Sequence, residues 1–298
     1  MRVTEEDRVW ARADGQDLLV RLYWPDGGAP HQQSSAAALP AIIDVHGGAW
    51  SSGDRSAGEL YNRHLANAGF LVAAIDFRQA PAHRHPAASC DVVAAVRWLR
   101  LNAVALGANS TNIDSTNIGL IGSSSGGHLA MLAATRHAAA EHRGTLILDC
   151  EGNAAAHDEL DASVAYVIAL WPVSDPLFRY RYAKRAGIAR LVAGHDAYYT
   201  NEAQMRDASI PRLVAAGEAQ SLPPLFVVQP GEDGNVPVEM TFDLLRAWQA
   251  RGGKLEYAYF PDMPHAFGHR ASAATTDMLE QVTDFARRRT AGGKHGRE

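Results

Sequence analysis

The chain has 298 residues, a formal net charge of −5 and 47% hydrophobic residues. This composition is ordinary for a globular protein, and the net negative charge argues against nucleic-acid binding. No apolar run is long enough to cross a membrane, and the first residues lack the apolar core of a signal peptide, so we expect a cytoplasmic protein with no membrane partner. The two cysteines, Cys90 and Cys150, indicate neither a disulfide framework nor a cysteine metal site.

An opening hairpin and then alternating strands and helices are predicted in chain order. Asp14-Gly15 separates two strand-like runs, as the turn of a hairpin would. Leu71–Ile75 is a continuous apolar run, which is typical of a buried parallel strand. The predicted strands lie at 9–13, 18–24, 41–45, 71–75, 117–121, 164–171, 225–229 and 255–260, and the helices at 58–68, 88–102, directly after Ser124, and around 278–285, with a loop at 27–35 and a solvated tail at 291–298.

This alternation predicts the α/β class, as a single domain over residues 1–298 with a mostly parallel sheet covered by helices on both faces. Two motifs follow strand-like runs. The first, His46-Gly47-Gly48-Ala49-Trp50, contains successive glycines that allow backbone N–H groups to point into a crevice. Taken alone, it is equally an ordinary turn at the end of a strand. Paired with the second motif, it predicts an oxyanion hole formed by the N–H groups of Gly48, Ala49 and Ser125.

The second motif is Gly122-Ser123-Ser124-Ser125-Gly126, the G-x-S-x-G pattern, between an apolar run and an apolar helix. Small residues at both ends let a strand turn sharply into a helix and present Ser124 in a strained conformation. The alternative, a serine- and glycine-rich loop without a role, does not account for the strand before the motif and the helix after it. We therefore predict that Ser124 is a nucleophile, which requires a base and an orienting acid.

The segment 174–221 breaks the alternation and is too long for a simple connection. We predict a helical cap over the crevice, with a surface insertion packed on the body as the alternative. Its basic residues Arg179, Arg181, Lys184 and Arg185 are expected on a solvated helix face, although they could instead attract an acidic substrate. Residues expected to contact substrate are Tyr180 and Tyr198 of this segment, together with Trp50, Trp171 and Phe267; for the two tryptophans core packing is equally plausible.

The acid is expected after the strand at 225–229, and the base after the last strand, because this fold orders its triad as serine, acid, histidine. We choose Asp233 over the neighbouring Glu232, because Asp233 stands three residues before Val236-Pro237, where a helix begins. His265 follows the strand at 255–260 within a proline-stiffened loop and is the predicted base. Two alternatives remain in that region. His269 is the alternative base, and Asp262 could make a local contact with His265.

These residues together resemble the HGG-motif esterase group of the α/β-hydrolases, which includes hormone-sensitive-lipase-like carboxylesterases and BD-FAE- and kynurenine-formamidase-like enzymes. The chain departs from the group's common pattern at four positions, which leaves the substrate open: Ala49, Phe77, Ser123 and Ser125. The similarity rests on His46–Trp50 with Gly53-Asp54, Phe77–Pro81 with His85–Ala88 and Asp91, Gly122–Ala130, Val236-Pro237 and His265–Phe267.

The resemblance implies a metal-independent and cofactor-free serine hydrolase that cleaves small or aryl carboxylic esters through an acyl-enzyme on Ser124. An arylformamidase or amidase with the same triad is the alternative, and a non-catalytic binding protein of the same fold is a third hypothesis, disfavoured because every triad member is present. His46 and His128 lie inside backbone motifs and are predicted to be structural. The expected partner is a small-molecule ester, and a homodimer is left open.

Overall fold

The computed structural model describes residues 2–27, 39–108 and 118–290. The predicted tail at 291–298 and most of the predicted loop at 27–35 lie outside these residues. No helix in the described ranges is both long and apolar enough to cross a membrane.

Within the described residues, ten strands form one sheet in the order β10-β9-β8-β5-β3-β4-β2-β1-β6-β7. The first six in that order pair in parallel, and the other four pair antiparallel. This confirms the predicted α/β class. The strands are β1 (Thr4–Ala13), β2 (Gln16–Trp24), β3 (Ala41–Val45), β4 (Leu71–Ile75), β5 (Ile118–Ser123), β6 (Leu146–Leu148), β7 (Ala154–Ala155), β8 (Tyr166–Leu170), β9 (Leu225–Glu232) and β10 (Leu255–Pro264).

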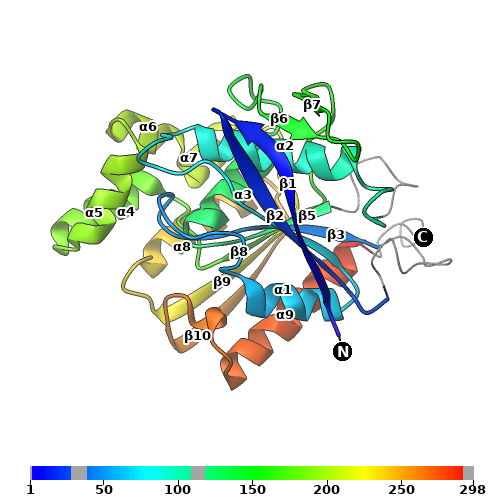
Figure 1. Ribbon diagram of the computed structural model, residues 1–298. Coiled ribbons are helices and arrows are strands. Elements are labelled where there is room, and N and C mark those ends of the chain that lie inside the picture. Colours follow the sequence, from blue (N-terminus) through cyan, green and yellow to red (C-terminus); the bar gives the residue numbers. More distant parts are fainter. Residues whose placement is uncertain (1, 28–38, 109–117, 291–298) are drawn as a thin grey trace.

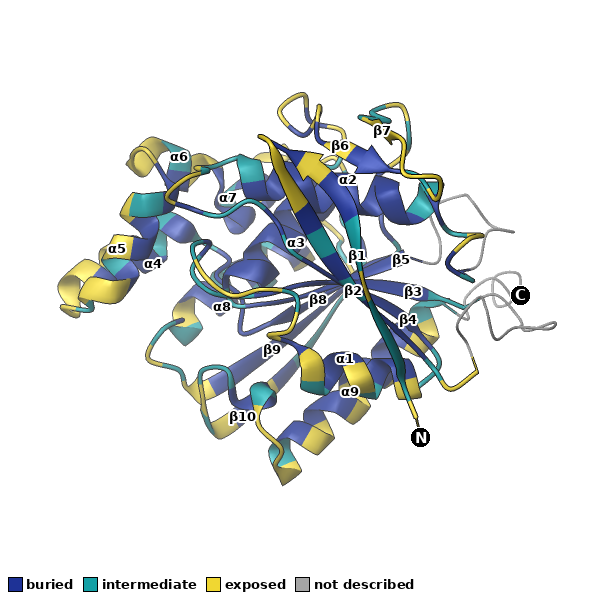
Figure 2. Ribbon diagram, viewed as in Figure 1, coloured by how far each residue is buried: buried dark blue, intermediate teal, exposed yellow. Residues whose placement is uncertain are grey.

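Helices cover both faces of the sheet, and each face has its own apolar core (Figures 1 and 2). One face carries α1 and α9, and the other carries α2, α3 and α8. Side chains of a strand alternate between the two cores, as Ile42 and Ile43 of β3 do. The bounds of these helices are α1 (Glu59–Asn67), α2 (Ala87–Leu101), α3 (Ser125–Thr135), α8 (Val238–Ala250) and α9 (Ala273–Thr290).

The segment between β8 and β9 forms four helices: α4 (Pro176–Arg185), α5 (Ala189–Tyr198), α6 (Glu202–Asp207) and α7 (Ile210–Ala216). Figure 1 shows α4, α5 and α6 projecting from one end of the sheet, whereas α7 packs against α8 and α3. Asp175 caps α4, because its carboxylate accepts a hydrogen bond from the amide of Phe178.

The parallel strands bring their carboxyl ends to one edge of the sheet. Val45 at the end of β3 pairs with Gly122 of β5, and Ser123 pairs with Leu170 at the end of β8. The HGG loop and the G-x-S-x-G turn therefore begin side by side. The loops after β9 and β10 leave the same edge, which is where ligands bind in open α/β sheets.

Candidate active site

The turn between β5 and α3 holds Ser124 in a backbone conformation that side chains rarely adopt, with φ 54° and ψ −117°. Close backbone approach explains the glycines around it. A Cβ atom at Gly126 would lie 1.9 Å from the carbonyl oxygen of Val45, and one at Gly122 would lie 2.4 Å from the carbonyl oxygen of Gly126. The amide of Ser124 donates to the carbonyl of Leu170, which fixes the strained residue against β8.

Three side chains from the loops at this edge form a hydrogen-bonded chain. His265 Nε2 lies 3.1 Å from Ser124 Oγ, and His265 Nδ1 lies 2.7 Å from Asp233 Oδ2. The Asp233 side chain is 1% exposed, and its Oδ1 accepts the amides of Asn235 and Val236. Those two bonds fix the carboxylate, so that His265 Nδ1–H donates to it and Nε2 is left to accept a proton from Ser124.

The alternative acids and base lie apart from this chain. Glu232 is exposed at the end of β9, and Asp262 is exposed within β10. The imidazole of His269 donates from Nδ1 to the carbonyl of Ala57, and burial lowers its pKa. The structure therefore joins Ser124, His265 and Asp233 by hydrogen bonds and leaves Glu232, Asp262 and His269 outside that chain.

The HGG loop runs through three consecutive residues with positive φ: Gly48 at 116°, Ala49 at 52° and Trp50 at 61°. A Cβ atom at Gly48 would lie 1.9 Å from the carbonyl oxygen of Ser52, so glycine is required there. The amide of Trp50 donates to Ser125 Oγ at 3.2 Å, which ties this loop to the first residue of α3. The Ser125 amide, at the helix N-terminus, thus lies beside the HGG loop, whose Gly48 and Ala49 line the adjoining cavity.

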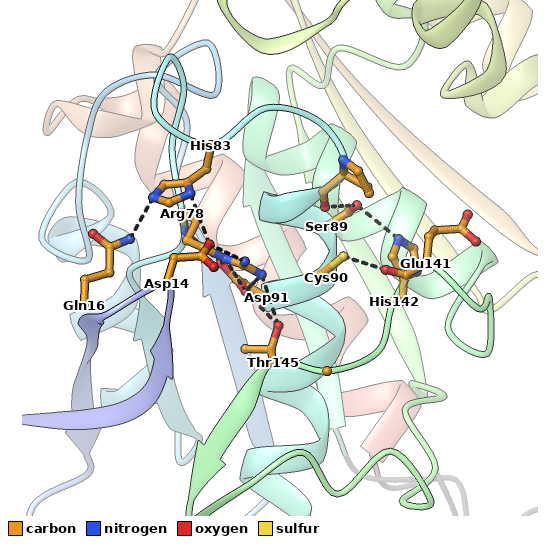
Figure 3. Close-up of polar contacts among 12 residues, drawn as sticks. Asp14, Gln16, Arg78, His83, Ser89, Cys90, Asp91, Glu141, His142 and Thr145 are labelled. Atoms are coloured by element: carbon orange, nitrogen blue, oxygen red, sulfur yellow. Dashed lines mark hydrogen bonds and ion pairs between the residues drawn. The ribbon is translucent and has the colours of Figure 1, made fainter.

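A network that we did not predict fixes the segment between the two motifs (Figure 3). Asp91 is buried on α2 and accepts hydrogen bonds from the backbone amide and the guanidinium of Arg78 at 2.7–3.1 Å, and from Thr145 Oγ1 at 3.0 Å. Arg78 also pairs with Asp14 in the first hairpin.

The segment held by Arg78 then supports the HGG loop directly. Gln79 donates to the carbonyl of Gly53, and the amide of Ala80 donates to the carbonyl of Trp50. In the sequence this segment stood out only by its resemblance to a family pattern. The contacts in the structure show that it positions the HGG loop.

A cavity of about 860 Å³ opens over the serine, between the sheet edge and helices α4 and α5. Of the five residues predicted to contact substrate, Trp171 lines it, whereas Trp50, Tyr180, Tyr198 and Phe267 are absent from its lining. Its lining includes Gly48, Ala49, Ser124, Trp171, Arg179, Arg190, Leu191, Ala193, Gly194, Ala197, Asn235, His265 and His269.

Packing explains why these four side chains lie outside the lining. Trp50 is fully buried and stacks on Tyr198 with ring centroids 5.2 Å apart, behind the HGG loop. Tyr180 turns its hydroxyl toward Asp196 of α5, and Phe267 packs against Trp171 from behind. These aromatic side chains hold the helices to the body, and they leave small residues of α5 to face the cavity.

The two histidines of the motifs make backbone contacts. His46 Nδ1 donates to the carbonyl of Gly47 at 2.6 Å, and its ring stacks on Phe77. His128 Nε2 donates to the carbonyl of Ala208 at 2.9 Å, and burial lowers the pKa of His128 to about 4. Both rings are therefore neutral at neutral pH.

Comparison with known proteins places this arrangement among hydrolases. The BD-FAE family model matches residues 29–248. An ethyl acetate hydrolase of Pseudomonas putida is 29% identical over 85% of this chain and 72% of its own. Esterase LipC of Mycobacterium tuberculosis is 29% identical over 83% of this chain, which spans 57% of LipC. Among solved structures, a Rhizomucor miehei esterase superimposes with a TM-score of 0.74 at 19% identity over 97% of this chain and 85% of its own, which shows a shared fold.

Proposed function

Because the chain belongs to the BD-FAE family of α/β-hydrolase esterases, we propose that it hydrolyses small carboxylic esters through an acyl-enzyme on Ser124. The observation that carries the proposal is the chain of contacts from Ser124 through His265 to Asp233, at 3.1 and 2.7 Å, at the wall of the cavity. This arrangement suits acyl transfer, because it supplies a nucleophile, a base and an acid that orients the base.

In the proposed reaction, Ser124 Oγ attacks the acyl carbon while His265 Nε2 accepts the serine proton. Asp233 stabilises the imidazolium that forms. The tetrahedral intermediate collapses, and His265 returns the proton to the departing alkoxide, so that an alcohol leaves. A water molecule then gives its proton to His265 and attacks the acyl-enzyme. Collapse of the second intermediate releases the carboxylic acid and restores Ser124.

The negative charge of both intermediates needs donors at a fixed position. The amides of Gly48, Ala49 and Ser125 are the proposed donors, since the first two line the cavity and the third begins α3. Removal of one such donor typically costs about 3 kcal/mol of transition-state stabilisation. The contact from Trp50 N to Ser125 Oγ supports the proposal, because it joins the two halves of the donor set.

The residues that line the cavity favour short acyl groups. Its helical wall presents Ala193, Gly194 and Ala197 beside Leu191, while Arg190 and Asn235 add polar groups. A long acyl chain needs a continuous apolar channel, which this mixed lining does not provide. The relative named as an ethyl acetate hydrolase is consistent with a small substrate. Preference for aryl esters rests on Trp171, the aromatic side chain that lines the cavity.

A panel of p-nitrophenyl esters of increasing acyl length, assayed beside N-formylkynurenine, tests the proposal. We expect kcat/KM to fall once the acyl chain exceeds about eight carbons, because the mixed lining offers no apolar channel for the rest of the chain. Ser124→Ala provides the background rate. An increase toward palmitoyl esters would contradict this argument from the cavity lining, and faster cleavage of the formamide than of every ester would favour the arylformamidase alternative.

A further inference from the structure

Arg179 of α4 is a buried cation that lines the same cavity as Ser124. The residue is 1% exposed, and its Nε and Nη2 atoms are buried without a hydrogen-bond partner. Its guanidinium lies 5.3 Å from the ring centre of Trp50, a contact that positions the charge but does not neutralise it. Arg179 thus combines full burial, access to the cavity and unused donors.

Buried Arg97 and partly buried Arg78, by contrast, are paired. Arg97 is 3% exposed, and its Nη1 donates to the carboxylate of Asp158 and to the carbonyl of His142. Arg78 is held by Asp91 and Asp14. Among the described residues, no carboxylate lies within ion-pair distance of Arg179. Burying an unpaired charge is strongly unfavourable, so the position calls for an anion that the protein does not supply.

The charge persists in the folded protein. Burial lowers the pKa of Arg179 to about 10, which leaves the guanidinium protonated at neutral pH. Asp233 is the acid near enough to attract it electrostatically, yet that carboxylate already accepts bonds from His265 and two amides. The Nε and Nη2 donors of Arg179 therefore stay without a protein partner, although the residue lines the cavity.

We propose that Arg179 binds a carboxylate of the substrate, so that the preferred substrates are esters that also carry a carboxylate. This inference deepens the proposed esterase function and rests on it. A guanidinium offers paired N–H groups that match the two oxygens of a carboxylate. Arg179 is the buried arginine at the cavity without a counter-charge among the described residues, and its single charge fits a carboxylate better than a dianionic phosphate. Arg190, which also lines the cavity, is exposed and already donates to the side chain of Asn235.

The test compares a carboxylate with its neutral isostere in two pairs of esters. Monoethyl glutarate and its carboxamide place the charge on the acyl side, whereas the acetyl esters of γ-hydroxybutyrate and of its amide place it on the alcohol side. We expect the wild-type enzyme to prefer the carboxylate by about tenfold or more in kcat/KM in at least one pair, through charge-assisted hydrogen bonds.

Substitution of Arg179 should remove that preference. In Arg179→Met the ratio of kcat/KM for the carboxylate to that for the carboxamide should fall by about ten- to a hundredfold. Arg179→Lys keeps the positive charge but lacks the paired N–H groups of a guanidinium, so it should retain part of the preference. Arg181→Met is the matched control, because Arg181 is exposed on the same helix, pairs with Glu202 and does not line the cavity. Its ratio should equal that of the wild type.

Three results would overturn the inference. The first is hydrolysis of all four esters by the wild-type enzyme with no preference for either carboxylate, a result that stands even if Arg179→Met fails to fold. The second is a folded Arg179→Met enzyme with an unchanged ratio. The third is no hydrolysis of any of the four esters by a wild-type enzyme that does hydrolyse p-nitrophenyl acetate. Inactivity toward p-nitrophenyl acetate as well would refute the proposed function itself, so the two failures are distinguished.

Discussion

The floor and the roof of the cavity are built from different kinds of contact. The floor consists of the loops that present Gly48, Ser124, Asp233 and His265, and backbone atoms there approach so closely that a Cβ at Gly48 would meet a carbonyl at 1.9 Å. The roof consists of α4 and α5 with Arg179, Leu191, Gly194 and Ala197, and it meets the floor where a Cβ at Gly194 would lie 3.1 Å from the Cβ of Ala49.

This difference separates chemistry from selectivity. The floor holds strained backbone and fixed hydrogen bonds, which a reaction common to many esterases requires. The roof contributes small side chains and one buried unpaired charge, which can change from relative to relative without disturbing the reacting groups. We therefore expect substitutions in the floor to act on kcat for every ester, and substitutions in the roof to act on the choice among esters.

Replacement of the nucleophile should have the largest effect. Ser124→Ala should lower kcat by roughly four to six orders of magnitude, because the triad loses the atom that bonds to the acyl carbon. Steady-state hydrolysis of p-nitrophenyl acetate measures it. Ser123→Ala is the neighbouring control and should stay within a fewfold of the wild type. Comparable losses in both variants would indicate damage to the turn instead.

The orienting acid should come next. Asp233→Asn should lower kcat by about four orders of magnitude, because an amide no longer stabilises the imidazolium and favours the wrong tautomer. Glu232→Gln changes the adjacent, exposed carboxylate and should stay close to wild-type activity. Equal and small losses in the two variants, measured by the same assay, would place the acid elsewhere.

Distortion of the HGG loop should have an intermediate effect. Gly48→Ala should lower kcat by about two to three orders of magnitude, because the new methyl group meets the Ser52 carbonyl and moves an oxyanion donor. Gly69 has a similarly positive φ of 100° but open space around its Cβ position, so Gly69→Ala serves as control. It should lose about 1 kcal/mol of stability and keep its kcat. Loss of kcat in Gly69→Ala would show that instability alone explains the first result.

The smallest expected effect is a loss of local stability in the roof helix α5 at acidic pH. Burial lowers the pKa of His195 on α5 to about 3, whereas an unfolded histidine titrates near 6.5. The free energy of unfolding is unaffected by this group above pH 6.5, where His195 is neutral in both states. It decreases as the pH falls from 6.5 toward 3, because the unfolded histidine binds a proton that the folded one does not. At pH 5 the local loss should be about 2 kcal/mol. Hydrogen exchange at pH 7 and pH 5 should show it in α5 and not in β8.

His195→Gln removes the titrating group and is the control for that measurement. In this variant the protection of α5, after correction for intrinsic exchange rates, should depend less on pH than in the wild type. Equal pH dependence in α5 and β8 of the wild-type protein would contradict the comparison of roof and floor.

The floor could be predicted from the sequence because its backbone geometry demands particular residues. Gly122 and Gly126 mark the turn, and the positions of Asp233 and His265 follow from the order of strands along the chain. The strands that we missed are the short β6 and β7, where three and two residues give too little periodicity to detect.

The roof could not be predicted in this way, because the direction of a helical side chain depends on tertiary packing. We expected Tyr180 and Tyr198 in the pocket and Arg179 on a solvated face, with attraction of an acidic substrate as the alternative for the arginine. Tyr198 instead stacks on Trp50, Tyr180 packs against His195, and Arg179 lines the cavity. Apart from Ala183, the sequence from 178 to 185 is basic or aromatic, so no apolar stripe shows which face of α4 turns inward.

Labelling with a fluorophosphonate tests the central claim most directly, since this probe phosphonylates a serine that a neighbouring base has activated. Mass spectrometry of the labelled wild-type protein and of its peptides should show one adduct, located on Ser124. The adduct should be absent in Ser124→Ala and should form far more slowly in Asp233→Asn. An enzyme that hydrolyses esters but carries no adduct, or carries it on another serine, would contradict the assignment of Ser124 as the nucleophile.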